Sequence, residues 1–328
     1  MGGSDPTRNL ALELARVTEA AALGAARFMG RGDKEAADAA AVNAMRVVLQ
    51  SVDMNGIIVI GEGEKDNAPM LYNGENVGNG LPPDVDVAVD PIDGTRPLAF
   101  GRTNSIATVA IAPRGSMFNP GPFVYMNKLA VGPEAKGVIN IEKSITENLK
   151  AIARAKEKDV EDLTTVILDR DLHKDMIVEI RKAGARIRLI PDGDVAGALM
   201  TAWPDSGVDV LLGIGGTPEG VIAACALRAM GGEIQGKLYA RDEHELRRGR
   251  EAGYDFDKIL TMDDLVSSED VFFAATGITD GELLQGVRYF GEGASTDSLV
   301  VRGLTGTVRQ INATHRIKKL NELSGGKY

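Results

Sequence analysis

The chain has 328 residues, of which 44% are hydrophobic and 26% are charged, so it is a globular protein large enough for two domains or one large α/β unit. Its 47 acidic residues outnumber its 37 lysines and arginines, which gives a net charge of −10. Because binding to a phosphate backbone requires a basic surface, this balance argues against a nucleic-acid partner. No apolar run approaches the roughly 20 residues that cross a bilayer, so we also expect no membrane partner.

Cysteine content and the N-terminal sequence favour a cytoplasmic protein. Cys225 is the single cysteine, so the chain has no intrachain disulfide and suits a reducing compartment. The opening sequence MGGSDPTRNL has neither the basic region nor the apolar core of a secretory signal. His173, His244 and His315 are far apart in the sequence, and we expect them at the surface rather than in a zinc site or a catalytic triad.

The first part of the chain predicts two helices followed by strands. Apolar residues spaced by three and four indicate helices over 9–28 and 35–52. Valines at 85, 87 and 89 alternate with less apolar residues, which is typical of a half-buried strand. Further strands are expected over 56–64, 105–113 and 123–132.

A different pattern follows a helix expected around 144–157. Short apolar strands over 164–169, 185–190 and 208–216 alternate with helical segments, which predicts βαβ units and a parallel sheet. Strands are expected again over 271–278 and within 286–312. We therefore predict an α/β fold with lobes 1–140 and 141–328, in which the C-terminal strands can return to the first lobe.

Carboxylates gather where the predicted strands end. They are Asp90 and Asp93 after one strand, Glu62, Glu64 and Asp66 after another, and Asp38 in an alanine-rich helix. Without nearby basic residues such acids repel one another unless a cation lies among them. Hard divalent ions such as Mg²⁺ and Mn²⁺ prefer oxygen ligands, and two ions about 3.5–4 Å apart are a common device for phosphoryl chemistry.

Gly94 and Thr95 directly follow the acids of the strand at 85–90. A glycine lets backbone N–H groups approach an anion, and the threonine hydroxyl can hold a water molecule. The alternative is a simple Asp-Gly turn with solvated acids. Together with Asp38 and the acids of 62–66, the pattern favours a site for metal and phosphate.

Two later loops have competing explanations. In GIGGTPEG, residues 213–220, helix capping alone would select Thr217, Pro218 and Glu219, so a metal-binding role for Glu219 stays open at this point. In PDGDVAG, residues 191–197, an Asp cap is the alternative to acids that grip sugar hydroxyls.

Three segments together resemble the class II fructose-1,6-bisphosphatases, which are members of the lithium-sensitive, metal-dependent sugar-phosphatase superfamily. They are GEGEKDNAPMLYNGENVGNG, VDPIDGT and GIGGTPEG. DPIDGT is shared with inositol monophosphatases, whereas IPDGDVAGA, GIGGTPEG and ATGITDGELLQGVRY are more specific to class II. The resemblance extends over about 9–322 and implies a layered α/β/α/β/α sandwich assembled as homodimers or homotetramers. It also implies that the first lobe binds metal and phosphate and the second binds the sugar.

The resemblance also implies roles for individual residues. Asp38, Glu62, Asp90, Asp93 and Glu219 match the ligands of Mn²⁺ or Mg²⁺. Asp66 and Thr95 match the catalytic pair that orients and deprotonates the attacking water. The positions matching substrate contacts are Asp93, Gly94, Thr95, Tyr125, Arg170, Asp171, Leu172, Asp192, Gly193, Asp194 and Gly216.

One position departs from the family pattern. Where the family commonly has a basic residue, proline, arginine and histidine, this chain has Arg170, Asp171, Leu172 and His173. Leu172 thus replaces an arginine expected to face the non-reacting phosphate. Because a charged hydrogen bond contributes about 1.5–3 kcal/mol, we expect weaker affinity or an altered preference, partly compensated by Arg170.

The resemblance predicts hydrolysis of the 1-phosphate of fructose 1,6-bisphosphate, a reaction of gluconeogenesis. Two alternatives stay open. One is a phosphatase that prefers sedoheptulose 1,7-bisphosphate or an inositol phosphate. The other is a regulator that binds sugar phosphate without hydrolysing it.

Overall fold

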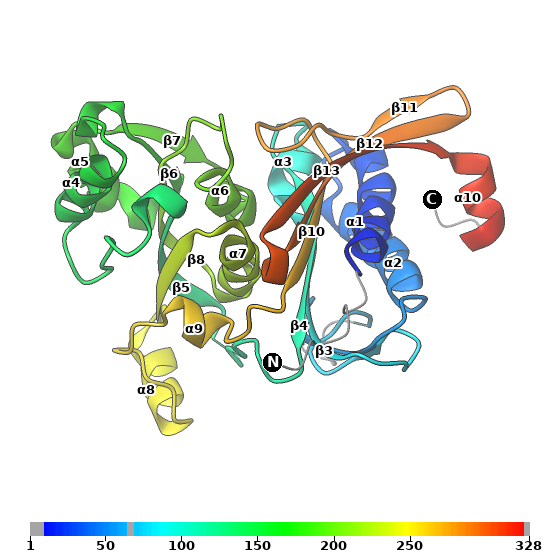
Figure 1. Ribbon diagram of the computed structural model, residues 1–328, viewed down its shortest axis with the longest axis horizontal. Helices are drawn as coiled ribbons and strands as arrows, with labels where there is room; N and C mark the ends of the chain where they lie inside the picture. The colour runs from blue at the N-terminus through cyan, green and yellow to red at the C-terminus, as the bar shows by residue number, and fades with distance from the viewer. Residues whose placement is uncertain (1–9, 64–68, 122, 325–328) are drawn as a thin grey trace.

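The computed structural model describes residues 10–63, 69–121 and 123–324, which form a mixed α/β fold with two mixed β-sheets (Figure 1). The first sheet has eight strands in the order β11-β12-β10-β4-β3-β1-β2, with β13 paired to β12. Its strands are β1 (Asn55–Ile60), β2 (Asn76–Val77), β3 (Asp84–Asp93), β4 (Ile106–Pro113), β10 (Phe272–Gly277), β11 (Arg288–Phe290), β12 (Gly293–Arg302) and β13 (Thr307–Arg316).

The second sheet has five strands in the order β7-β6-β8-β5-β9. They are β5 (Tyr125–Val131), β6 (Thr164–Leu168), β7 (Arg186–Ile190), β8 (Val210–Gly216) and β9 (Glu233–Leu238). The expected parallel pairing is confirmed for β6 with β7 and β8. β5, however, runs antiparallel to β8 and β9, so the sheet is mixed. The chain enters this sheet after β4 and returns to the first sheet with β10.

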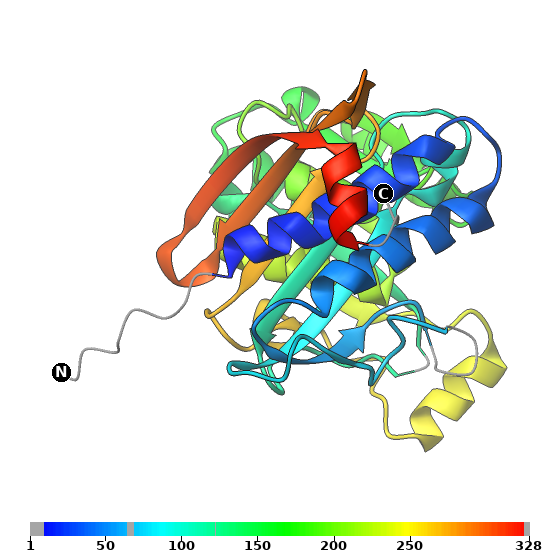
Figure 2. The same cartoon turned by 90° about the vertical axis from the view of Figure 1, so that its right-hand side faces the viewer.

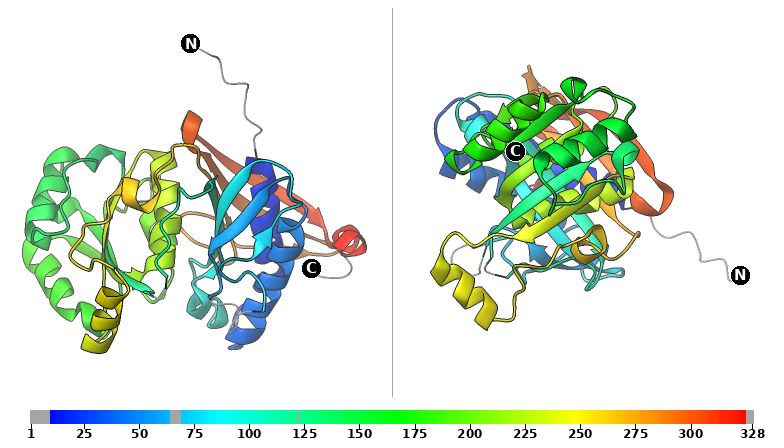
Figure 3. Two further views of the ribbon diagram at one scale, coloured as in Figure 1. Left: turned by 90° about the horizontal axis from the view of Figure 1, so that it is seen from below. Right: turned by 90° about the vertical axis from the view of Figure 1, so that its left-hand side faces the viewer.

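Helices flank both sheets. They are α1 (Ala11–Ala25), α2 (Lys34–Leu49), α3 (Thr95–Ala99), α4 (Ile145–Ala155), α5 (Lys174–Ala183), α6 (Asp194–Met200), α7 (Thr217–Met230), α8 (Glu243–Glu251), α9 (Met262–Leu265) and α10 (Ile317–Ser324). α1 and α2 lie side by side against the first sheet (Figure 2), and α4 and α5 pack on the second. α6 and α7 contact strands of both sheets, as the view from below shows (Figure 3). In the described part of the chain, no helix combines the length and the apolar character that crossing a membrane requires.

Helix starts follow the capping residues of the sequence. The Asp33 side chain accepts a hydrogen bond from the backbone N–H of Ala36 and caps α2. Ser144 and Glu147 form a reciprocal capping box at the start of α4. Each cap satisfies N–H groups that have no partner within the helix, which fixes where these helices begin.

The expectation that the strand at 85–90 is half-buried is wrong, because both faces of β3 are covered. Its valines lie in the core shared with α1 and α2, whereas Ala88 lies in the core that contains α7. Even Asp86 is only 3% exposed, and it accepts a hydrogen bond of 3.1 Å from the backbone N–H of Met117. The alternation of the sequence reflects small and polar residues that fit against α7, rather than a face turned to water.

Candidate active site

An irregularity at the end of β3 brings Asp90 and Asp93 to the same side of the sheet. Asp90 lies opposite Thr108 and Asp93 opposite Ile106, so β3 contains one more residue than β4 over this interval. In a regular strand two residues three apart point to opposite faces, and one inserted residue cancels that difference. The carboxylates are close enough for the charge of Asp93 to raise the pKa of Asp90.

Several of the acids carry raised pKa values. Burial raises the pKa of Asp90 well above its usual range, and the charges of Asp93, Glu219 and Glu62 add to the effect. Glu62 is exposed as a residue, yet the protein surrounding its carboxylate, together with Asp38 and Glu219, raises its pKa to about 7. Burial also raises the pKa of Asp38. The charge of Lys34 lowers the pKa of Asp38, but burial has the larger effect.

Asp93 connects the first sheet with α6. The carboxylate is 3% exposed, and its Oδ2 accepts a hydrogen bond of 3.0 Å from the backbone N–H of Ala196. Gly193, which precedes α6, has a φ of 84°, a left-handed conformation that favours glycine. The tight turn lets the first turn of α6 approach Asp93.

Glu219 lies in the first turn of α7, directly after β8. Its Oε2 is buried, and among the described residues it has no hydrogen-bond partner. Asp90, Glu62 and Glu219 share a cavity of about 220 Å³. An unpartnered buried carboxylate oxygen is costly, so this oxygen indicates a partner that the described residues do not supply.

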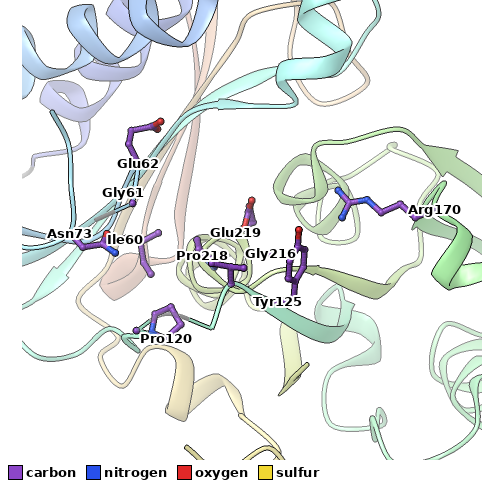
Figure 4. A pocket seen from close by; sticks show the side chains of 13 residues that line it. Ile60, Gly61, Glu62, Asn73, Pro120, Tyr125, Arg170, Gly216, Pro218 and Glu219 are labelled. Carbon is purple, nitrogen blue, oxygen red and sulfur yellow. The ribbon is translucent and has the colours of Figure 1, made fainter. Parts of the chain in front are cut away.

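Next to this cavity is a larger pocket of about 510 Å³ (Figure 4). Glu62 stands on one wall, Glu219 and Tyr125 lie at the centre, and Arg170 reaches in from the opposite side. The Nη2 of Arg170 lies 3.6 Å from Asp192 Oδ1, and both side chains keep about a third of their surface exposed (34% and 29%). Arg170 therefore remains accessible to an anionic ligand.

Thr95 and Gly94 lie where β3 gives way to α3. The Thr95 hydroxyl lies 3.3 Å from Asp38 Oδ1 and 3.3 Å from the carbonyl of Ile92, either of which can accept its hydrogen. Gly94 has a φ of 96°, and its carbonyl accepts a hydrogen bond of 2.7 Å from the Ser105 hydroxyl. The glycine thus makes the turn that places the Thr95 hydroxyl beside Asp38.

Two of the expected residues are not described, and two others are exposed to solvent. Asp66 lies outside the described residues, as does Glu64. Asp171 is turned to solvent with 94% of its side chain exposed, and its carboxylate pairs with Lys174 at 2.9 Å. Leu172 is 47% exposed in the short 3₁₀ turn after Arg170.

Lys128 is a residue of the site that the sequence interpretation missed. It is 3% exposed; its Nζ lies 2.6 Å from Asp194 Oδ2 and donates a hydrogen bond of 2.8 Å to the Gly216 carbonyl. Its charge lowers the pKa of Glu219, against the larger effect of burial. One signal was available, because a lysine within the otherwise uncharged strand YMNKLAV requires a buried partner.

The expectation of a surface position is wrong for His173, which is fully buried. Its Nδ1 donates to the Leu168 carbonyl at 2.7 Å, and its Nε2 accepts from the backbone N–H of Ile214 at 2.8 Å. This arrangement requires the neutral ring, and burial lowers the pKa accordingly. His173 therefore connects β6 to β8 and leaves no ring nitrogen for catalysis.

Over residues 10–63, 69–121 and 123–324, no three Asp, Glu, His or Cys side chains are gathered into a ready-made metal centre. The carboxylates instead surround the cavity from β3, α7 and the loop after β1. Such an arrangement fits a cation that keeps part of its water shell, as Mg²⁺ does. The donor set, which is oxygen from carboxylates, suits the same hard ions.

Comparison with known proteins agrees with the resemblance noted in the sequence. Residues 8–315 match the family described as bacterial fructose-1,6-bisphosphatase, glpX-encoded. Fructose-1,6-bisphosphatase 1 class 2 of Escherichia coli (strain K12) is 46% identical over 325 residues, covering 95% of this chain and 96% of that protein. Fructose-1,6-bisphosphatase class 2 of Shigella flexneri matches to the same extent, 46% over 325 residues. The chain therefore belongs to the family of bacterial class 2 fructose-1,6-bisphosphatases.

Proposed function

We propose that this protein hydrolyses the 1-phosphate of fructose 1,6-bisphosphate and releases fructose 6-phosphate and inorganic phosphate. Membership of the family supports the reaction and its substrate. The observation that carries the assignment of the site is the buried, unpartnered Oε2 of Glu219, which borders a cavity shared with Glu62 and Asp90. A metal-dependent phosphatase binds a cation at such a place, whereas a solvated turn would leave no buried oxygen without a partner.

We propose that Mg²⁺ or Mn²⁺ binds here. The ligands would be Asp38, Glu62, Asp90, Asp93 and Glu219. Each phosphate of the substrate carries about −1.5 to −2 charges at neutral pH, so this acidic site would repel it without a cation. When bound, divalent cations neutralise phosphate oxygens and lower the pKa of a coordinated water. Ligation partly through water is consistent with carboxylates that surround the cavity without meeting.

The remaining residues would bind and orient the reactants. The Thr95 hydroxyl, beside Asp38, is placed to hold a water near the acids, and Asp66 remains the proposed base that deprotonates it. Arg170 and Tyr125 line the larger pocket and would hold the sugar and its second phosphate. The backbone around Gly94 would support the reacting phosphate. Further proposed contacts are Asp93, Asp192, Gly193, Asp194 and Gly216, together with Asp171 and Leu172.

Several broader features remain proposals. We propose that the two sheets and their helices form the α/β/α/β/α sandwich of sugar phosphatases, which the position of α6 and α7 in contact with both sheets supports. We also propose two lobes, 1–140 and 141–328. The C-terminal strands β10, β12 and β13 belong to the first sheet, which favours their return to the first lobe. β5 lies within residues 1–140 but pairs in the second sheet. A homodimer or homotetramer is proposed on the resemblance alone, and a cytoplasmic location on the single cysteine.

Phosphate release by EDTA-treated protein tests the function. Fructose 1,6-bisphosphate, sedoheptulose 1,7-bisphosphate and inositol 1-phosphate are each supplied before and after Mn²⁺ or Mg²⁺ is restored. Release from the fructose substrate that depends on the metal supports the proposal, and faster release from another substrate would reassign it. Binding of the fructose substrate without release, by protein that circular dichroism shows to be folded, would instead identify a regulator.

A further inference from the structure

A single buried ammonium group holds the two halves of the site together. The Nζ of Lys128 contacts Asp194 Oδ2 at 2.6 Å and the Gly216 carbonyl at 2.8 Å. Asp194 is the first residue of α6 and is 7% exposed, and Gly216 directly precedes α7. Lys128 itself lies on β5, between β8 and β9 in the second sheet.

Each contact of Lys128 leads to a different proposed metal ligand. Through Asp194 the ammonium fixes the first turn of α6, where the backbone N–H of Ala196 binds Asp93 at 3.0 Å. Through the Gly216 carbonyl it fixes the start of α7, three residues before Glu219. Asp93 belongs to the first sheet, whereas Glu219 follows a strand of the second. Lys128 is therefore placed to set the separation between these two carboxylates.

Packing around the ammonium leaves little freedom. A Cβ on Gly215 would lie 1.9 Å from Asp194 Oδ2 and 3.0 Å from Lys128 Nζ, so a larger residue there would displace the Asp194 carboxylate. A Cβ on Gly220 would lie 3.2 Å from Lys128 Cδ. The Lys128 side chain is therefore held along its length by the segment that carries Glu219. A residue that positions its neighbours must itself be fixed in this way.

A second largely buried lysine, Lys156, pairs with Asp209 away from the proposed metal ligands. At the opposite end of β8, Lys156 lies 2.7 Å from Asp209 Oδ1, with 12% and 2% of the two side chains exposed. Asp209 also accepts a hydrogen bond of 2.8 Å from the backbone N–H of Thr164. Lys158 Nζ also lies 2.8 Å from Asp209 Oδ1, so Lys156→Met removes a largely buried ammonium while Asp209 keeps an ionic partner. Because this group contacts none of the proposed ligands, the variant is a control for loss of a largely buried lysine outside the site.

We propose that Lys128 is a positioning residue for cation binding, which it serves by holding α6 with Asp93 and α7 with Glu219 in one fixed arrangement. The proposal rests on the metal site proposed above. Groups that orient metal ligands typically contribute about 10- to 100-fold to metal affinity. We therefore expect Lys128→Met to weaken Mn²⁺ binding to the same degree without removing any ligand.

Mn²⁺ binding to the substrate-free protein separates positioning from stability. Free Mn²⁺ is measured by its electron paramagnetic resonance signal while it is titrated into EDTA-treated wild type, Lys128→Met, Lys156→Met and Glu219→Gln. Urea unfolding of the same samples gives their stabilities. Both lysine variants should lose stability, but only Lys128→Met should raise the Kd for Mn²⁺ by about 10-fold or more. Lys156→Met should stay within twofold of wild type.

Contrary results separate failure of the positioning role from failure of the metal site. If wild type binds Mn²⁺ tightly, Glu219→Gln weakens it and Lys128→Met matches wild type, the positioning role is refuted and the metal site stands. If wild type shows no saturable binding, the metal site and the inference fail together. If Lys128→Met does not fold, the double variant Lys128→Met/Asp194→Asn replaces it. This variant removes the Asp194 charge that Lys128→Met would leave buried without a partner. The double variant should show the same weaker Mn²⁺ binding, and wild-type Mn²⁺ affinity in it would refute the positioning role of Lys128.

Discussion

Gly216→Ala should disable the site while sparing the fold. Gly216 has φ −68° and ψ 139°, a conformation that alanine adopts without strain. A Cβ at this position would lie 1.6 Å from Glu219 Oε2, whereas real Cβ atoms essentially never approach closer than 3.0 Å. The Glu219 carboxylate must therefore retreat by at least 1.4 Å, the difference between the two distances.

Displacing the Glu219 carboxylate should cost little free energy of folding, but it should impair catalysis. Because the displaced atom ends a flexible side chain, a rotamer change of about 0.5–1.5 kcal/mol can accommodate the new methyl group. A misplacement of about 1 Å in a catalytic site can lower the rate about 100-fold. We thus expect Gly216→Ala to lose about 100-fold in kcat/KM, with weaker Mn²⁺ binding and a nearly unchanged free energy of unfolding.

Phosphate release, Mn²⁺ titration and urea unfolding measure these three effects. Gly56→Ala is the matched control, because its Cβ would lie 2.9 Å from Val87 Cγ2 and 3.0 Å from Val77 Cγ2, at the start of β1 and outside the site. It should lower stability and keep Mn²⁺ affinity. Adding Gly216→Ala to Glu219→Gln should change little further, since both act through one carboxylate. Wild-type kcat/KM in Gly216→Ala would refute this geometry of Glu219.

Three further outcomes follow from individual residues. Burial of Glu19 raises its pKa from 4.5 to about 7, so the folded protein binds this proton more tightly than the unfolded chain. Stability therefore falls as the pH rises through that interval. Glu19→Gln should thus raise the free energy of unfolding by up to about 3 kcal/mol at pH 8 and hardly at all at pH 4, and equal gains at both pH values in urea titrations would contradict the assignment. Asp90→Asn should abolish phosphate release with the circular dichroism spectrum unchanged, and near-normal turnover would remove Asp90 from the site. Leu172→Arg should lower KM for fructose 1,6-bisphosphate by about 10-fold or more, whereas an unchanged KM would show that this position does not face a phosphate.

Sequence patterns located most of the acids because their spacing relative to strand ends is local information. Asp90, Asp93 and Glu62 follow apolar strands, and the strands lie side by side in the first sheet. For Glu219 the local pattern was ambiguous, since Thr217 and Pro218 suit a helix start whether or not a ligand follows. In the structure, the buried Oε2 of Glu219 has no hydrogen-bond partner among the described residues, which supports the ligand role that we propose. No local pattern contains that information.

Features that depend on contacts distant in the chain could not be predicted. The inserted residue between Asp90 and Asp93 is defined by the register with β4, which the sequence does not display. Burial of β3 on both faces depends on α7, more than 100 residues further along the chain. The same holds for His173, whose acceptor nitrogen is satisfied only because β8 pairs beside β6.

The charge balance of the site explains why a cation and a proton should compete for it. Burial and mutual repulsion raise the pKa values of Asp90, Asp93 and Glu219, and that of Glu62 to about 7. The buried ammonium of Lys128 lowers the pKa of Glu219 but does not balance the cluster, because Asp194 already pairs with it at 2.6 Å. Protons and divalent ions therefore relieve the same repulsion, and metal binding must release the protons that the carboxylates hold. Cation affinity should accordingly increase with pH through the neutral range, where Glu62 changes its charge.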